Sequence, residues 1–141
     1  MARTLLGFDF GTRRIGIAVG QEITHTAQGL TTISNLGDEP NWSAIDTLIK
    51  QWQPQLLIVG MPHHLDDRPH ELRPLVQSFG DKLKARYHLP VAWIDEKLSS
   101  SEAQTRLSQQ PRPKQRRQDK TEIDKLAAEL ILQTWLNSNP G

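Results

Sequence analysis

The chain of 141 residues contains no cysteine, and this absence excludes several classes of protein at once. Without thiols there is no disulfide scaffold, thiolate zinc site, iron–sulfur cluster or cysteine nucleophile. No apolar run approaches the roughly 18 residues that a membrane span needs, and the N-terminus lacks the apolar segment of a signal peptide. We therefore expect one cytoplasmic domain over residues 1–141 that binds no membrane, with an oligomeric state that the sequence leaves open.

There is also little net charge, since the formal value is +1, but the cations are unevenly distributed. The segment 109–120 has two prolines and no apolar periodicity, so we expect a mobile basic loop there. Such a loop attracts phosphates without regard to base sequence, although a solvated surface would have the same composition. Its candidate nucleic-acid contacts are Arg112, Lys114, Arg116, Arg117 and Lys120.

The first third of the chain has the pattern of strands. An apolar run at 5–10 is typical of a strand covered on both faces, and the short turn after it predicts an antiparallel partner at 15–20. A third strand is expected at 24–33. Further on, apolar stripes at helical spacing alternate with short apolar runs. They predict helices at 42–52, 72–83, 99–107 and 121–135, and strands at 56–59 and 91–94.

This order predicts an α/β fold. A three-stranded antiparallel meander followed by βαβα units forms a five-stranded mixed sheet with helices on both faces. Because right-handed crossovers connect the first, fourth and fifth strands, these three are expected to be parallel. Ligands of open α/β sheets bind beyond the carboxyl ends of such strands.

Acidic residues fall at these strand ends. Asp9 lies near the end of the first strand, while Asp95 and Glu96 follow the fifth, and Asp124 lies in the first turn of the last helix. Carboxylates brought together repel one another and need a cation, and their oxygens suit Mg²⁺ or Mn²⁺. Two such ions stabilise the attacking and leaving oxygens of a phosphodiester displacement.

Each acid also has a purely structural explanation. A hydrogen bond across the following turn would also explain Asp9, and alternation leaves Asp95 and Glu96 equally placed. Asp124 stands three residues after Thr121, where a capping box and the helix dipole favour a negative charge. Ala128, one turn later on the same face, is small enough to let that face approach the sheet closely.

Glycines surround the first acid. Gly11 suits a turn with positive φ or a close approach of phosphate to the backbone, although a plain hairpin glycine is equally consistent. Arg13 and Arg14 in the same turn are candidates for phosphate contacts, or are simply solvated. No Gly-Lys-Ser/Thr or Gly-x-Gly-x-x-Gly pattern follows, so a nucleotide-binding loop is not indicated.

Taken together, four segments resemble the YqgF/RuvX family, and the resemblance extends over nearly the whole chain. They are Gly7-Phe8-Asp9-Phe10-Gly11-Thr12-Arg13-Arg14-Ile15-Gly16, Ile58-Val59-Gly60-Met61-Pro62, Asp95-Glu96-Lys97-Leu98-Ser99-Ser100, and Lys120 to Leu132. The resemblance implies an RNase H-like nuclease domain and metal-binding catalytic acids at Asp9, Glu96 and Asp124. It thereby favours Glu96 over Asp95 and a metal role for Asp124 over a cap.

Three functions follow as hypotheses. The first is a metal-dependent endonuclease that matures the 5′ end of pre-16S rRNA during ribosome biogenesis. The second is a resolvase of branched DNA of the Holliday-junction type. The third is a non-catalytic maturation factor that holds ribosomal precursor RNA through the basic loop. Metal binding by the three acids separates the third from the other two.

Overall fold

The computed structural model describes residues 3–37, 39–61, 72–95 and 120–138, and all structural statements refer to these ranges. They contain five strands and three helices. The strands are β1 (Thr4–Phe10), β2 (Arg14–Gln21), β3 (Thr26–Ser34), β4 (Leu56–Met61) and β5 (Val91–Asp95). The helices are α1 (Trp42–Trp52), α2 (Leu72–Tyr87) and α4 (Lys120–Ser138).

The strands form one mixed sheet in the order β3-β2-β1-β4-β5. Strands β1, β2 and β3 pair antiparallel, whereas β4 pairs parallel with both β1 and β5. The expected five-stranded topology is therefore confirmed. The parallel strands β1, β4 and β5 consequently direct their carboxyl ends to the same edge of the sheet.

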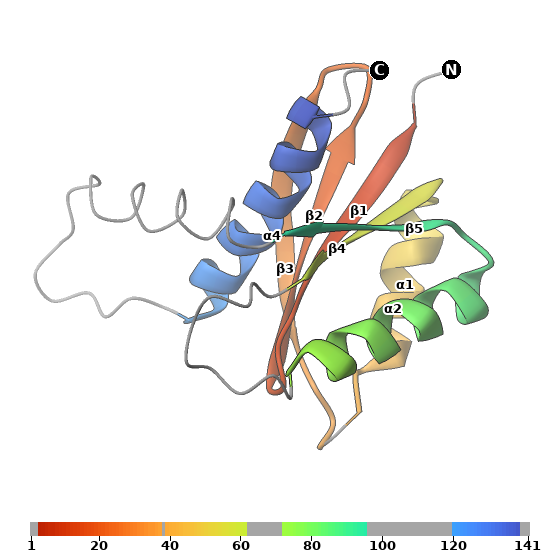
Figure 1. Ribbon diagram of the computed structural model, residues 1–141, viewed down its shortest axis with the longest axis vertical. Helices are drawn as coiled ribbons and strands as arrows, with labels where there is room; N and C mark the ends of the chain where they lie inside the picture. Colours follow the sequence, from red (N-terminus) through yellow and green to blue (C-terminus); the bar gives the residue numbers. More distant parts are fainter. Residues whose placement is uncertain (1–2, 38, 62–71, 96–119, 139–141) are drawn as a thin grey trace, which may run out of the picture.

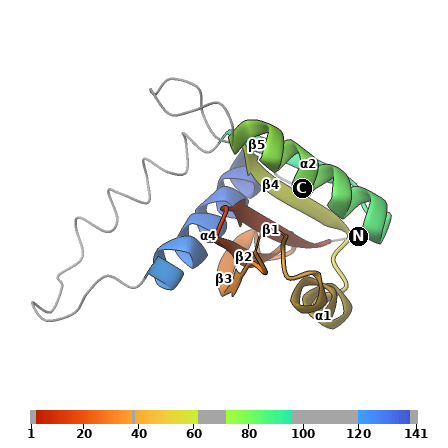
Figure 2. The same cartoon turned by 90° about the horizontal axis from the view of Figure 1, so that it is seen from below.

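Helices cover the two faces of the sheet unequally (Figure 1). Helices α1 and α2 lie on one face and α4 on the other, as the view from below also shows (Figure 2). Because neighbouring strand residues point to opposite faces, each strand contributes to two apolar clusters. Leu6 and Phe8 pack on the α1/α2 side, and Leu5 packs on the α4 side.

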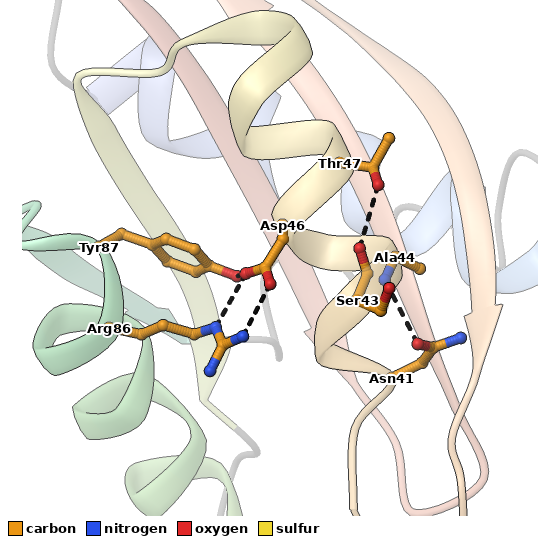
Figure 3. Close-up of polar contacts among 7 residues, drawn as sticks. All are labelled: Asn41, Ser43, Ala44, Asp46, Thr47, Arg86 and Tyr87. Carbon is orange, nitrogen blue, oxygen red and sulfur yellow. Dashed lines mark hydrogen bonds and ion pairs between the residues drawn. The ribbon is translucent and has the colours of Figure 1, made fainter.

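Polar contacts fasten α1 to α2 (Figure 3). Arg86 donates two hydrogen bonds to the Asp46 carboxylate, at 2.8 and 2.7 Å, and the Tyr87 hydroxyl donates a third at 2.6 Å. The guanidinium also lies 5.3 Å from the ring centre of Trp42. At the start of α1, the Asn41 side chain accepts a hydrogen bond from the Ala44 backbone amide and caps the helix.

Element boundaries differ modestly from the sequence-based expectations. The third strand starts two residues later than expected, and α2 continues four residues further, to Tyr87. Helix α4 begins at Lys120. Thr121 therefore lies inside the helix and is not its N-cap residue. The expected helix at 99–107 and the rest of the basic loop lie outside the described residues.

None of the helices in the described ranges is both long enough and apolar enough to cross a bilayer.

Candidate metal and nucleic-acid site

Asp9 is on the face of the sheet that α4 covers. Along β1, Leu5 packs in the cluster under α4, and a Cβ at Gly7 would be 3.0 Å from Leu132 of that helix. Side chains alternate along a strand, so Asp9, two residues after Gly7, points to the same face. Its side chain is half-buried. The last carboxylate before the carboxyl end of β1 is thus directed toward the helix that carries Asp124.

Gly16 brings α4 to this acid. Asp9 and Gly16 are directly opposite each other in the antiparallel pair of β1 and β2. A Cβ at Gly16 would collide with the Asp124 carbonyl and lie 3.2 Å from the Asp124 Cβ. Only glycine therefore lets the first turns of α4 rest on β2 at this point.

Asp9 and Asp124 are neighbours as a result. Residues directly opposite on paired strands have Cβ positions about 5 Å apart, and the Asp124 Cβ is 3.2 Å from the Cβ position of Gly16. The Cβ atoms of the two acids are consequently within about 9 Å of each other. This separation allows both carboxylates to reach one ion.

The third predicted acid lies outside the described residues. Strand β5 ends at Asp95, whose backbone pairs with Met61 at the end of β4. Glu96 follows Asp95 in sequence, and its placement remains a prediction, as does the choice between these two acids.

Arg14 forms an ion pair with Asp124. Its Nε donates to Asp124 Oδ2 at 2.8 Å, and the two side chains are 28% and 22% exposed. Arg14 is two residues before Gly16 on β2, so its side chain is directed to the same α4-covered face. The ion pair joins residues 110 positions apart in sequence. Asp124 therefore carries a partner cation within the candidate site.

The turn between β1 and β2 is held by Asn35, just after β3. The Asn35 amide donates to the Arg13 carbonyl at 2.8 Å, and its side-chain Nδ2 donates to the Gly11 carbonyl at 2.9 Å. Of the alternatives open for Gly11, positive φ is not observed. Glycine is required there for another reason, because a Cβ would be 2.6 Å from the Arg14 carbonyl. Arg13 is exposed in this turn.

The residues present fit a hard divalent cation in part. Asp9 and Asp124 supply carboxylate oxygens, the ligands that Mg²⁺ and Mn²⁺ prefer. Within the described ranges, no cluster of three or more acidic, histidine or cysteine side chains is placed to hold a metal. Glu96, which lies outside those ranges, is the predicted third carboxylate ligand.

Sequence reasoning missed two features of this site. It weighed Gly16 only as one of several glycines around Asp9, and it treated Arg14 as a phosphate contact without a partner. A signal for the first was present, since Gly16, Ala18 and Gly20 leave one face of β2 with almost no side chains. The remaining predicted cations, Arg112, Lys114, Arg116 and Arg117, lie outside the described residues, and nothing is described of the Lys120 side chain.

Solved structures share this fold at low sequence identity. The chain aligns with Thermus thermophilus RuvC in complex with a Holliday junction substrate at a TM-score of 0.55 and 18% identity, over 97% of each chain. It aligns with the yeast mitochondrial Holliday junction resolvase Ydc2 at a TM-score of 0.54 and 11% identity, over 96% of this chain and 81% of that one. These similarities establish a RuvC-like RNase H fold.

Sequence relatives are much closer. A protein of Nitrosococcus oceani named "Putative pre-16S rRNA nuclease" is 49% identical over 95% of this chain and 86% of its own length. A protein of Haemophilus ducreyi with the same name is 44% identical over 99% of this chain and its full length. The family model described as "RuvX: Holliday junction resolvase" matches residues 3–138. On these similarities and on its fold, the chain belongs to the RuvX/YqgF family.

Proposed function

We propose that this chain is a divalent-metal-dependent nuclease that hydrolyses phosphodiester bonds in the 5′-end maturation of pre-16S rRNA. The observation that carries the proposal is the close packing of α4 on Gly16, which brings Asp124 near Asp9 on the sheet. The RNA substrate is proposed from the names of the relatives that are 49% and 44% identical.

Asp9, Glu96 and Asp124 are the proposed ligands that would hold the divalent ions. When bound, such ions activate water and stabilise the departing 3′ oxygen. In the hydrolysis, the water oxygen bonds to phosphorus, the bond from phosphorus to the 3′ oxygen breaks, and the 3′ oxygen takes a proton.

The protein's own contribution is to hold the acids rigidly. Asp9 is fixed because β1 is paired on both sides, with β2 and with β4. Asp124 is fixed because Ala128, one turn later, is fully buried against the sheet. Rigid ligands favour catalysis because little reorganisation is needed when the ion and the substrate bind.

Phosphate binding is proposed for the cations around the acids. Arg13 is exposed in the turn beside the site, and Arg14 is held at the site by its ion pair with Asp124. The basic segment precedes α4 directly in sequence, so its cations and Lys120 are proposed to bind the RNA backbone.

Cleavage by an Asp9→Asn variant tests the catalytic proposal. Loss of a group that only orients a metal ligand already costs 10–100-fold, so loss of a ligand should lower the cleavage rate at least about 100-fold. Asp81→Asn is the matched control, because Asp81 is exposed on α2. An Asp9→Asn protein that cleaves precursor rRNA at the parental rate would refute the assignment.

The same assay distinguishes the alternative substrates. Precursor rRNA and a synthetic four-way DNA junction are offered side by side to the parent protein. Preferential cleavage of the junction would replace the rRNA proposal with a resolvase function. If calorimetry shows no Mn²⁺ uptake that depends on Asp9 and Asp124, the non-catalytic maturation factor becomes the better description.

A further inference from the structure

The Arg14 guanidinium and the proposed divalent ion would both bind the carboxylate of Asp124. Arg14 Nε is 2.8 Å from Oδ2 of this carboxylate, and the proposed metal site uses the same side chain. A divalent ion that binds Asp124 must therefore share the carboxylate with the guanidinium or displace it.

We infer that Arg14 lowers the affinity of the site for its divalent ion by competing for Asp124. This inference rests on the proposed function and makes Arg14 a positioning residue that acts through Asp124. The ion pair orients the Asp124 side chain toward Arg14 on β2, and the positive charge of Arg14 opposes any further cation at the same oxygen atoms.

Two opposite effects decide the sign of the change when Arg14 is replaced. Removing the guanidinium lets Asp124 change rotamer, which weakens metal binding somewhat because the ligand must be reordered. Removing its charge also abolishes the repulsion between a monovalent and a divalent cation a few ångströms apart. Both side chains are less than one-third exposed, so water screens this repulsion less than at an open surface. The electrostatic effect should win.

Arg13 is a natural control for this charge effect. It carries the same charge one residue away, but it is exposed in the turn before β2. Water and salt screen a charge in that position efficiently. Replacing it should therefore change metal affinity much less than replacing Arg14.

The test is calorimetric titration of the full chain with Mn²⁺, comparing the parent with Arg14→Gln, Arg14→Lys and Arg13→Gln. Arg14→Gln should bind Mn²⁺ about three- to tenfold more tightly than the parent, and Arg13→Gln should change the affinity less than about twofold. Arg14→Lys should stay near the parental value, since it retains the charge.

Thermal unfolding with and without Mn²⁺ gives an independent readout. A tighter ion stabilises the folded state more at the same concentration, so the Mn²⁺-induced rise in melting temperature should be larger for Arg14→Gln than for the parent. A gain of this kind cannot come from structural damage, which would weaken a site rather than strengthen it.

The outcomes separate this inference from the proposed function. Equal or weaker Mn²⁺ binding by Arg14→Gln, in a protein whose parent binds Mn²⁺ through Asp9 and Asp124, would overturn the inference alone. An equal gain in the lysine variant would also overturn it, because charge would not be the cause. A parent protein without Mn²⁺ uptake dependent on these acids would refute both.

Discussion

Gly16 lies directly opposite Asp9 on the neighbouring strand. Because Gly16 has no side chain, the first turns of α4 can occupy the space next to it. The residue opposite Asp9, which is one proposed ligand, is therefore the residue against which Asp124, another proposed ligand, packs. A sheet position with no side chain and a helix position with a carboxylate act together, although they are more than 100 residues apart in sequence.

Substitution of Gly16 should move Asp124 away from Asp9. In Gly16→Ala, the added methyl group meets the Asp124 carbonyl, which is backbone and has little room to move. We expect a loss of about 3 kcal/mol in the free energy of unfolding, at the upper end for overpacking, and weaker Mn²⁺ binding. Urea unfolding and calorimetry measure the two effects.

Gly20→Ala is the matched control, because the atoms nearest to its methyl group would be side-chain carbons at or near the ends of Leu132 and Leu136. These ends can adjust, so the cost should be about 1 kcal/mol with unchanged Mn²⁺ affinity. Equal stability and metal affinity in the two variants would show that close packing of α4 does not depend on Gly16.

The Gly11–Arg13 turn should depend on the donor character of Asn35. Asn35→Ala removes the hydrogen bond to the Gly11 carbonyl, which is worth about 1 kcal/mol. It also removes Oδ1, which is buried without a hydrogen-bond partner in the described part of the chain, so the net loss should be smaller. Asn35→Asp should destabilise the protein more than alanine, because it directs a carboxylate at a carbonyl. The opposite order in urea unfolding would contradict this account.

Acid should weaken the attachment of α1 to α2. Hydrogen bonds from Arg86, and then from Tyr87, lower the pKa of Asp46 from 3.8 to about 2. The folded-state pKa is therefore below the unfolded-state value, so the stabilisation is complete above about pH 4 and is lost as the pH falls through about 2. Melting temperatures of the parent and Asp46→Asn should differ by a few degrees at neutral pH and converge in acid.

The control for this pH series is Asp81→Asn, which removes an exposed carboxylate from α2 and leaves Asp46 intact. Its melting temperature should follow that of the parent throughout. A difference between parent and Asp46→Asn that persists unchanged down to pH 2 would show that the ionised carboxylate does not contribute to stability.

The basic segment should carry a salt-dependent part of RNA binding. Replacement of Arg112, Lys114, Arg116 and Arg117 by glutamine removes four cations, and each phosphate contact on a single strand contributes about −0.7 to the slope of log affinity against log salt. We therefore expect a shallower slope and weaker binding, while the thermal stability stays close to that of the parent. Fluorescence titration of an RNA oligonucleotide at several salt concentrations measures the slope, and an unchanged slope would exclude these residues from the interface.

Several local features could be predicted because short-range rules govern them. The apolar runs of β1 and β4 indicated strands buried on both faces. Ala128 suggested a close approach of the last helix to the sheet, and it is fully buried. Each of these inferences depends on neighbours within a few positions, where backbone geometry and burial leave few alternatives.

Other features were beyond local reasoning. The residues around Asp124 favoured a capping residue over a metal ligand, and only the resemblance to the family reversed that preference. At Gly11 the sequence left positive φ, a close approach of phosphate and a plain hairpin glycine open, whereas the structure requires glycine because of the Arg14 carbonyl. The Asp124 case depends on Gly16, which is in another segment of the chain, whereas the Gly11 case depends on a carbonyl only three residues away, whose position the residue types alone do not give.

The sequence by itself determined the order of strands and helices, the mixed sheet and the acids at its strand ends, because periodic burial and turn chemistry act over a few residues. Only the tertiary structure decided that Asp124 rests on Gly16 beside Asp9 and that Arg14 pairs with it. Those contacts follow from how closely a helix can pack on a particular strand, and that distance is determined by side-chain volume on two elements far apart in the chain.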